Sequence, residues 1–143
     1  MSSQKRQPWP ERFTERFHIF ALGEKFDVDA FLSQSTLRST CVWRQMGNGP
    51  TNGLELLLGD AQSLRLPEQE KIAIDYLKEH REELRALGNF PGVEALNLGF
   101  QYRAPSRAIG VCVGPSKGLM FHALEAGVRV NYYITLPRHR ADS

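Results

Sequence analysis

Hydrophobic and polar residues alternate along several stretches of the chain, which predicts strands of a sheet with one buried face. The clearest stretch lies near the C-terminus, where Val128, Val130, Tyr132, Ile134 and Leu136 share one parity. The same alternation predicts strands at about residues 12–22, 38–46, 54–58, 93–102, 109–113 and 128–136.

A second pattern, in which apolar residues recur every three or four positions, predicts helices. It is longest across residues 67–87, a stretch that Pro67 and Gly88 delimit. Shorter helices are predicted after Asp27 and Ser116, because either side chain can accept a backbone N–H at a helix start. The predicted helices are 28–33, 67–87 and 116–127.

The resulting order, β-α-β-β-α-β-β-α-β, predicts an α+β fold. We expect a six-stranded, mainly antiparallel sheet with three helices on one face, because cleanly alternating strands are covered on one side only. The first six elements follow the ferredoxin-like order. The expected domain covers residues 12–136, between flexible tails at 1–11 and 137–143.

Composition and charge narrow the function classes. The chain has 143 residues, 41% hydrophobic and 24% charged, which is typical of one globular domain. Its formal net charge of +2 is spread along the sequence, which argues against nucleic-acid binding. No stretch approaches the roughly 18 apolar residues of a membrane span, and no apolar leader segment begins the chain. These observations predict a cytoplasmic protein that binds no membrane.

Motifs for catalysis are absent from the sequence. No histidine or cysteine spacing fits a metal site, and no nucleophile with a nearby base can be named. We therefore predict no catalytic residue, metal or cofactor, and favour a protein that is not an enzyme.

One loop could bind an anion. Residues 114–118, Gly-Pro-Ser-Lys-Gly, lead into the last predicted helix, where backbone N–H groups, Ser116 and Lys117 could hold a negative charge. The alternative is a capped helix with an exposed lysine, because the P-loop spacing is missing.

The uncovered face of the sheet is the main candidate site. Strand parity places a mixture of charged, amide and aromatic side chains there, which could bind a polar ligand or a protein; the alternative is an ordinary solvated face. The candidate residues are His18, Arg44, Glu55, Asn97, Gln101, Arg129, Asn131 and Tyr133.

Several short motifs in this chain resemble those of a known group of proteins. Gly23 precedes a Phe-Asp-x-x-x-Phe helix at residues 26–31, Trp43 lies in the next strand, and the Ser-capped helix is followed by Gly127 and an aromatic strand. Together, over about residues 12–136, they resemble a family of small bacterial α+β domains of unknown function. The resemblance implies the fold and brings no activity with it.

Two hypotheses about function remain open. The first is a non-enzymatic binding or protein-interaction module, of the inhibitor or immunity type, that binds a protein or a second copy of itself through the open sheet face or the long helix. The second is a small-molecule binder or enzyme with a polar cleft near His18, Arg44 and Tyr133. A flat surface around these residues favours the first hypothesis, and a concave one favours the second.

Overall fold

The computed structural model describes residues 17–45, 52–58 and 65–137, with the side chains of residues 42–45 left out. The predicted N-terminal tail, nearly all of the predicted C-terminal tail and the start of the first predicted strand lie outside the described residues.

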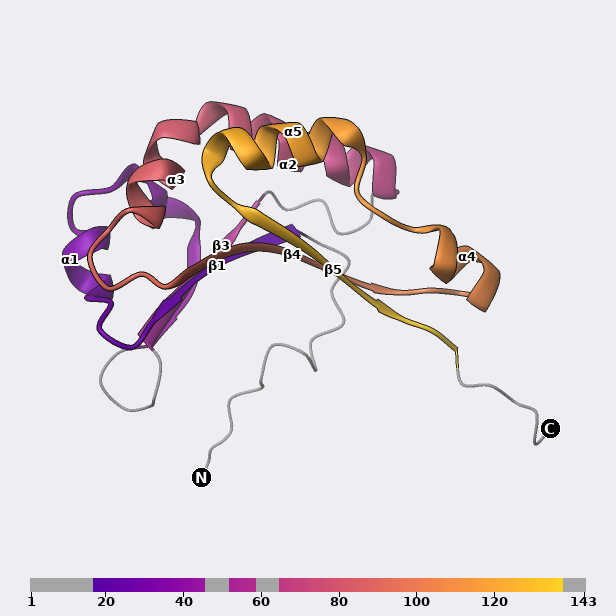
Figure 1. Cartoon of the computed structure of the whole chain (residues 1–143), viewed down its shortest axis with the longest axis horizontal. Helices are drawn as coiled ribbons and strands as arrows, with labels where there is room; N and C mark the ends of the chain where they lie inside the picture. The colour runs from indigo at the N-terminus through magenta and orange to yellow at the C-terminus, as the bar shows by residue number, and fades with distance from the viewer. Residues whose placement is uncertain (1–16, 46–51, 59–64, 138–143) are drawn as a thin grey trace, which may run out of the picture.

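A single sheet runs through the molecule, with the strand order β2-β3-β1-β4-β5 (Figure 1). The central strand β1 pairs antiparallel with β3 on one side and with β4 on the other. The edge strand β5 is parallel to β4. The strands are β1 Phe17–Gly23, β2 Cys41–Gln45, β3 Asn52–Leu57, β4 Ala95–Arg103 and β5 Arg129–Thr135.

Helices form the second layer. In Figure 1, α2, α3 and α5 lie over one face of the sheet, while α1 and α4 lie at opposite ends of the molecule. The helices are α1 Val28–Leu32, α2 Leu66–Glu79, α3 Arg81–Gly88, α4 Arg107–Cys112 and α5 Lys117–Ala126, with a 3-10 helix, η3, at Thr36–Thr40.

The α+β class holds, but the predicted architecture is wrong in its details. The described residues form a mixed sheet of five strands and five α-helices, not a six-stranded, mainly antiparallel sheet with three helices. Two local differences account for most of this change: a predicted strand is a helix, and the long predicted helix is divided.

The stretch predicted as a strand at 109–113 lies largely in helix α4. Ser106 caps this helix, because its Oγ accepts the backbone N–H of Ile109 at 3.2 Å. The run of β-branched residues favours a strand locally. However, β4 and β5 are parallel neighbours, which a tight turn cannot join. The chain must cross over the sheet between them, and α4 and α5 form that crossover.

The long predicted helix is divided at His80. This residue has φ −108° and ψ 22°, outside the helical region, and separates α2 from α3. Hydrogen bonding continues through the bend: His80 N–H donates to the Tyr76 carbonyl, and Leu84 N–H donates to the His80 carbonyl. Because neither proline nor glycine marks the position, the sequence contains no signal for the bend.

The predicted helix boundaries around α1 and α5 are confirmed. Asp27 Oδ1 accepts the N–H of Ala30 at 3.1 Å, and Ser116 Oγ accepts the N–H of Leu119 at 3.1 Å. Gly127 ends α5 in the left-handed conformation, with φ 77°. Short polar side chains and one glycine therefore determine where these helices begin and end.

The hydrophobic core lies between the sheet and the helices. Ile19, Leu56 and Leu98 are aligned across three strands and fully buried. Next to them, the ring of Phe17 stacks on that of Phe100 with 4.5 Å between centroids. Burial of each such side chain stabilises the fold by about 1.5–3 kcal/mol.

Gly92 allows a close approach between two connections. Its φ of +94° lies in the region that favours glycine, and a Cβ built there would lie 2.3 Å from the Lys25 carbonyl oxygen. The turn before β4 therefore contacts the backbone before α1 in a way that no larger residue permits.

We expect Gly92→Ala to destabilise the protein by at least about 2 kcal/mol, because it adds both backbone strain and a backbone clash. Gly114→Ala is the matched control, since a Cβ at Gly114 would meet nothing within 4 Å. Urea unfolding of the two variants checks this. Equal midpoints would show that the turn can rearrange at no cost.

Candidate functional site

The strand registers show which residues share the sheet face opposite the core. His18 and Glu55 lie next to each other on β1 and β3, and Asn97 lies opposite Arg129 on β4 and β5. The described residues on this second face that sequence analysis named are His18, Glu55, Asn97, Gln101, Arg129, Asn131 and Tyr133.

Arg44 does not follow the predicted alternation. A bulge between Cys41 and Trp43 shifts the register of β2, so Arg44 is paired with Leu54, whose side chain belongs to the core face. The side chain of Arg44 lies outside the described residues. The predicted cleft near His18, Arg44 and Tyr133 therefore stays a prediction.

The part of the second face around β1 and β3 is not solvated. His18, Glu55 and Gln101 are only 4%, 1% and 7% exposed. Nδ1 of His18 contacts Oε2 of Glu55, both side chains being buried, and the His18 ring stacks against that of Phe20. Removing either side chain takes away a buried polar contact of the other, which lowers the stability of the fold.

The part of the second face along β5 is accessible. Tyr133 is 44% exposed, Arg129 is exposed and Asn131 is partly buried. The predicted face thus divides into a buried polar half and an accessible half at the edge of the sheet.

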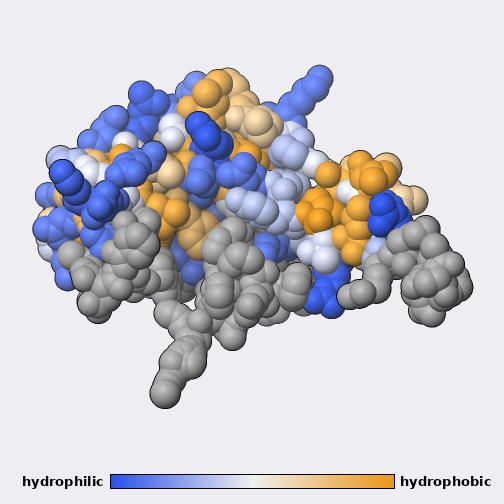
Figure 2. All heavy atoms as spheres, turned by 60° about the horizontal axis from the view of Figure 1, so that its bottom comes forward, coloured by the Kyte–Doolittle hydropathy of each residue, from blue (hydrophilic) through white to orange (hydrophobic). Residues whose placement is uncertain are grey.

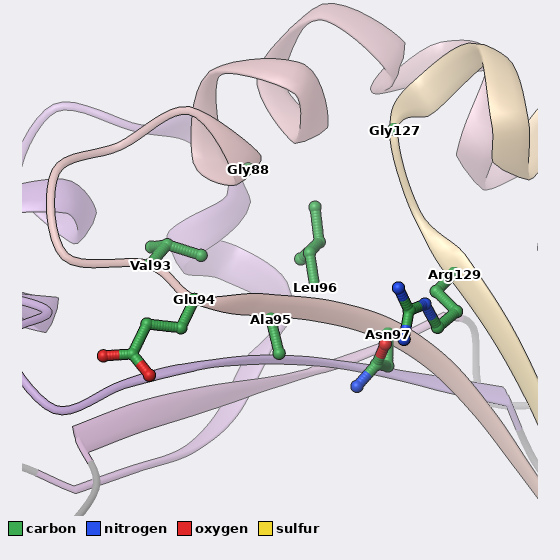
Figure 3. Close-up of a pocket in the computed structure, with 8 residues that line it drawn as sticks. All are labelled: Gly88, Val93, Glu94, Ala95, Leu96, Asn97, Gly127 and Arg129. Atoms are coloured by element: carbon green, nitrogen blue, oxygen red, sulfur yellow. The ribbon is translucent and has the colours of Figure 1, made fainter.

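A cleft of about 290 Å³ opens where β4 and β5 begin. Figure 3 shows the side chains of Asn97 and Arg129 close together at one side, with Leu96 pointing up between Gly88 and Gly127. These two glycines mark the C-terminal ends of α3 and α5. A guanidinium next to an amide can hold a carboxylate or a phosphate group. The lining residues are Gly88, Val93, Glu94, Ala95, Leu96, Asn97, Gly127 and Arg129.

At the start of α5, where an anion site was predicted, a carboxylate of the protein is already bound. Glu70 Oε2 accepts the backbone N–H of Ser116 at 3.0 Å and the hydroxyl of Tyr132 at 2.8 Å. Burial and this contact with Glu70 raise the pKa of Tyr132 well above its ordinary value. Lys117 next to it is exposed. Binding of an external anion at Ser116 and Lys117 stays a prediction, and it would have to compete with Glu70.

A second tyrosine joins α2 to η3. The hydroxyls of Tyr76 and Thr40 are 2.8 Å apart, and burial raises the pKa of Tyr76 to about 12. Both tyrosines therefore stay neutral and serve as links between elements.

Sequence analysis missed the outer surface of α5. Met120, Phe121 and Leu124 are 45%, 55% and 74% exposed, while Leu119 and Ala123 on the same helix are buried. A signal was present: besides the buried Leu119 and Ala123, this ten-residue helix carries three further large apolar residues, more than one buried stripe needs. Helix α4 adds exposed Ile109 and Val111, and Figure 2 shows hydrophobic residues gathered at that end of the molecule.

Two features are absent from the part of the chain that the structure describes. No group of three or more His, Cys, Asp or Glu side chains there could hold a metal ion. No helix there is both long and apolar enough to cross a membrane.

No protein-family model, curated protein or solved structure matches the chain. The resemblance to small bacterial domains of unknown function therefore stays a prediction.

We expect His18→Ala to destabilise the fold by about 1–3 kcal/mol, because it removes a buried polar contact with the buried Glu55 side chain. Lys71→Ala is the control: it removes an exposed ion pair with Asp75, which contributes about 0.5 kcal/mol at most. Urea unfolding at neutral pH measures both. If His18→Ala cost no more than Lys71→Ala, the pair would not stabilise the sheet.

Proposed function

We propose that this protein is a non-enzymatic interaction module that binds a protein partner through one side of the domain. We call this the β5–α5 side and define it by the outer edge of β5, at Val130, Tyr132 and Ile134, and by Met120 and Leu124 of α5. The observation that supports the proposal best is the exposure of large apolar side chains on α5, next to the last strand of the sheet.

Both parts of this side favour association. Exposed apolar residues that cluster on a rigid element are typical of protein-binding surfaces. An edge strand offers a row of backbone donors and acceptors that another strand can pair with. Between Val130 and Ile134, β5 contains neither the lysine nor the proline that commonly blocks such pairing.

The structure also holds this side in place. Glu70 of α2 joins the start of α5 to Tyr132 of β5, and Val128 N–H donates to the Ala123 carbonyl across the turn between them. A surface that is already ordered loses little conformational entropy on binding, which supports a role in recognition.

Site-specific crosslinking tests the proposal. We expect a photoreactive amino acid at Leu124, introduced in cells of the native host, to form covalent adducts with a protein. The same amino acid at Lys78, which is exposed on α2, should form none. Absence of adducts from Leu124, or equal yields at both positions, would contradict the proposal.

The cleft next to Asn97 and Arg129 favours a second candidate, a binder of small carboxylates or phosphates. Its support is that two of the residues singled out from sequence meet at the opening of a concave site. This cleft lies at the start of β4 and β5 and is not lined by His18 or Tyr133.

For this candidate, succinate or inorganic phosphate at millimolar concentration should raise the melting temperature of the wild type in a saturable way. Arg129→Gln should abolish the shift, whereas Arg107→Gln, which changes an exposed arginine of α4, should keep it. An identical shift in the Arg129→Gln variant would exclude this site.

A further inference from the structure

The outer edge of β5 has a defined hydrogen-bonding pattern. The Thr135 carbonyl accepts the N–H of Ala104 at 2.9 Å, so the backbone groups of Thr135 point toward β4. Successive residues of a strand point their backbone groups to alternate sides. Val130, Tyr132 and Ile134 therefore direct their N–H and carbonyl groups outward, where no strand among the described residues pairs with them.

The flank of α5 above this edge is apolar. A Cβ built at Gly118 would lie 3.5 Å from Ile74 of α2, and Glu125 contacts Arg81 of α3. These contacts identify the side of α5 that faces the other helices. At about 100° of rotation per residue, Met120 and Leu124 lie on the opposite side, toward the β5 edge. The outward backbone groups of β5 and the apolar side chains of α5 thus lie on the same side of the domain.

We infer that the partner of the β5–α5 side is a second copy of this chain, an inference that rests on the proposed function. The two β5 strands pair antiparallel across a two-fold axis at Tyr132. Val130 of each copy then lies opposite Ile134 of the second copy, and each outward N–H meets an outward carbonyl. The two sheets become one continuous sheet.

The same two-fold rotation also brings the α5 helices and the second faces of the two copies into complementary positions. The two α5 helices lie antiparallel on one face of the joined sheet, so that Met120 and Leu124 of both copies cover one another. Lys117, at the start of α5, lies toward the C-terminal end of the second α5, where a positive charge is favourable. On the second face, Tyr133 of each copy lies beside Asn131 of the other, as a cross-strand pair.

A single peptide strand would fit this side less completely. It could satisfy the outward backbone groups of β5, but it would leave Leu124 of α5, 74% exposed, without cover. A second copy supplies a strand and a helix at the same spacing, which is why we favour it over an extended peptide.

Light scattering coupled to size-exclusion chromatography tests the inference on the full chain. We expect a molar mass of twice the 16.2 kDa of one chain. Ile134→Pro removes one outward N–H from each copy and should give monomers, since an edge strand tolerates proline where its N–H faces outward. Ile134→Ala loses the same side chain but keeps that N–H, and it should remain a dimer.

The helix flank is tested in the same experiment. Leu124→Glu should raise the dissociation constant of the dimer at least about a hundredfold, because two buried leucines are replaced by two like charges. Phe121→Glu makes the same change on the same helix, but on the side turned away from the β5 edge, and should leave the constant within about threefold. Circular dichroism melts show that each variant is folded.

Three outcomes would overturn the inference. They are a monomeric wild type, a dimer that Ile134→Pro leaves intact, and equal effects of Leu124→Glu and Phe121→Glu. A different result would contradict the proposed function itself. A monomer whose Leu124 photo-adduct contains a different protein would contradict only the second copy, whereas the absence of any adduct would contradict the interaction module itself.

Discussion

The parallel pairing of β4 and β5 is the constraint on which the accessible surface of this protein depends. Parallel neighbours cannot be joined by a tight turn, so the chain leaves the sheet after β4, crosses over it and returns. That crossover is made of α4 and α5, which places α5 over β5. It also makes β5 the end of the sheet, so a helix flank and a strand edge lie together on one side.

The carboxylate of Glu70 holds this arrangement together. It joins three elements at one point, because it accepts hydrogen bonds from the backbone N–H of Ser116, the N-cap of α5, and from the hydroxyl of Tyr132 in β5, while it projects from α2. The same contact occupies the start of α5, where sequence patterns predicted an external anion. One acidic side chain thus helps to place the proposed binding surface and also shields a polar site next to it.

Sequence patterns predicted the elements that are determined locally, either by alternation of apolar and polar residues or by a capping residue. Strands β4 and β5 alternate cleanly, Asp27 and Ser116 begin helices by accepting a backbone N–H, and Gly127 ends one through its left-handed conformation. The differences arise where tertiary structure overrides local preference. The crossover turns a β-branched run into α4, and the bend at His80 divides a helix that contains no breaking residue.

The candidate site was predictable only in part, for the same reason. Alternation placed seven of the named side chains on one face, but it could not show the irregular register of β2, in which the backbone of Arg44 is paired with Leu54. It also could not show that His18 and Glu55 would be buried, since burial depends on how other segments pack. The apolar residues of α5 are visible in the sequence, but their spacing alone does not show which of them face solvent.

The central position of β1 has a consequence for how the chain can assemble during synthesis. Its two neighbours are β3 and β4, so His18 must pair with both Leu57 and Gly99. On the ribosome, the first partner is complete long before the second, and one side of β1 remains open until about residue 103 has emerged. Strand β5 is the last of the five strands to be synthesised, so the edge proposed for association can be completed only after the rest of the sheet is available.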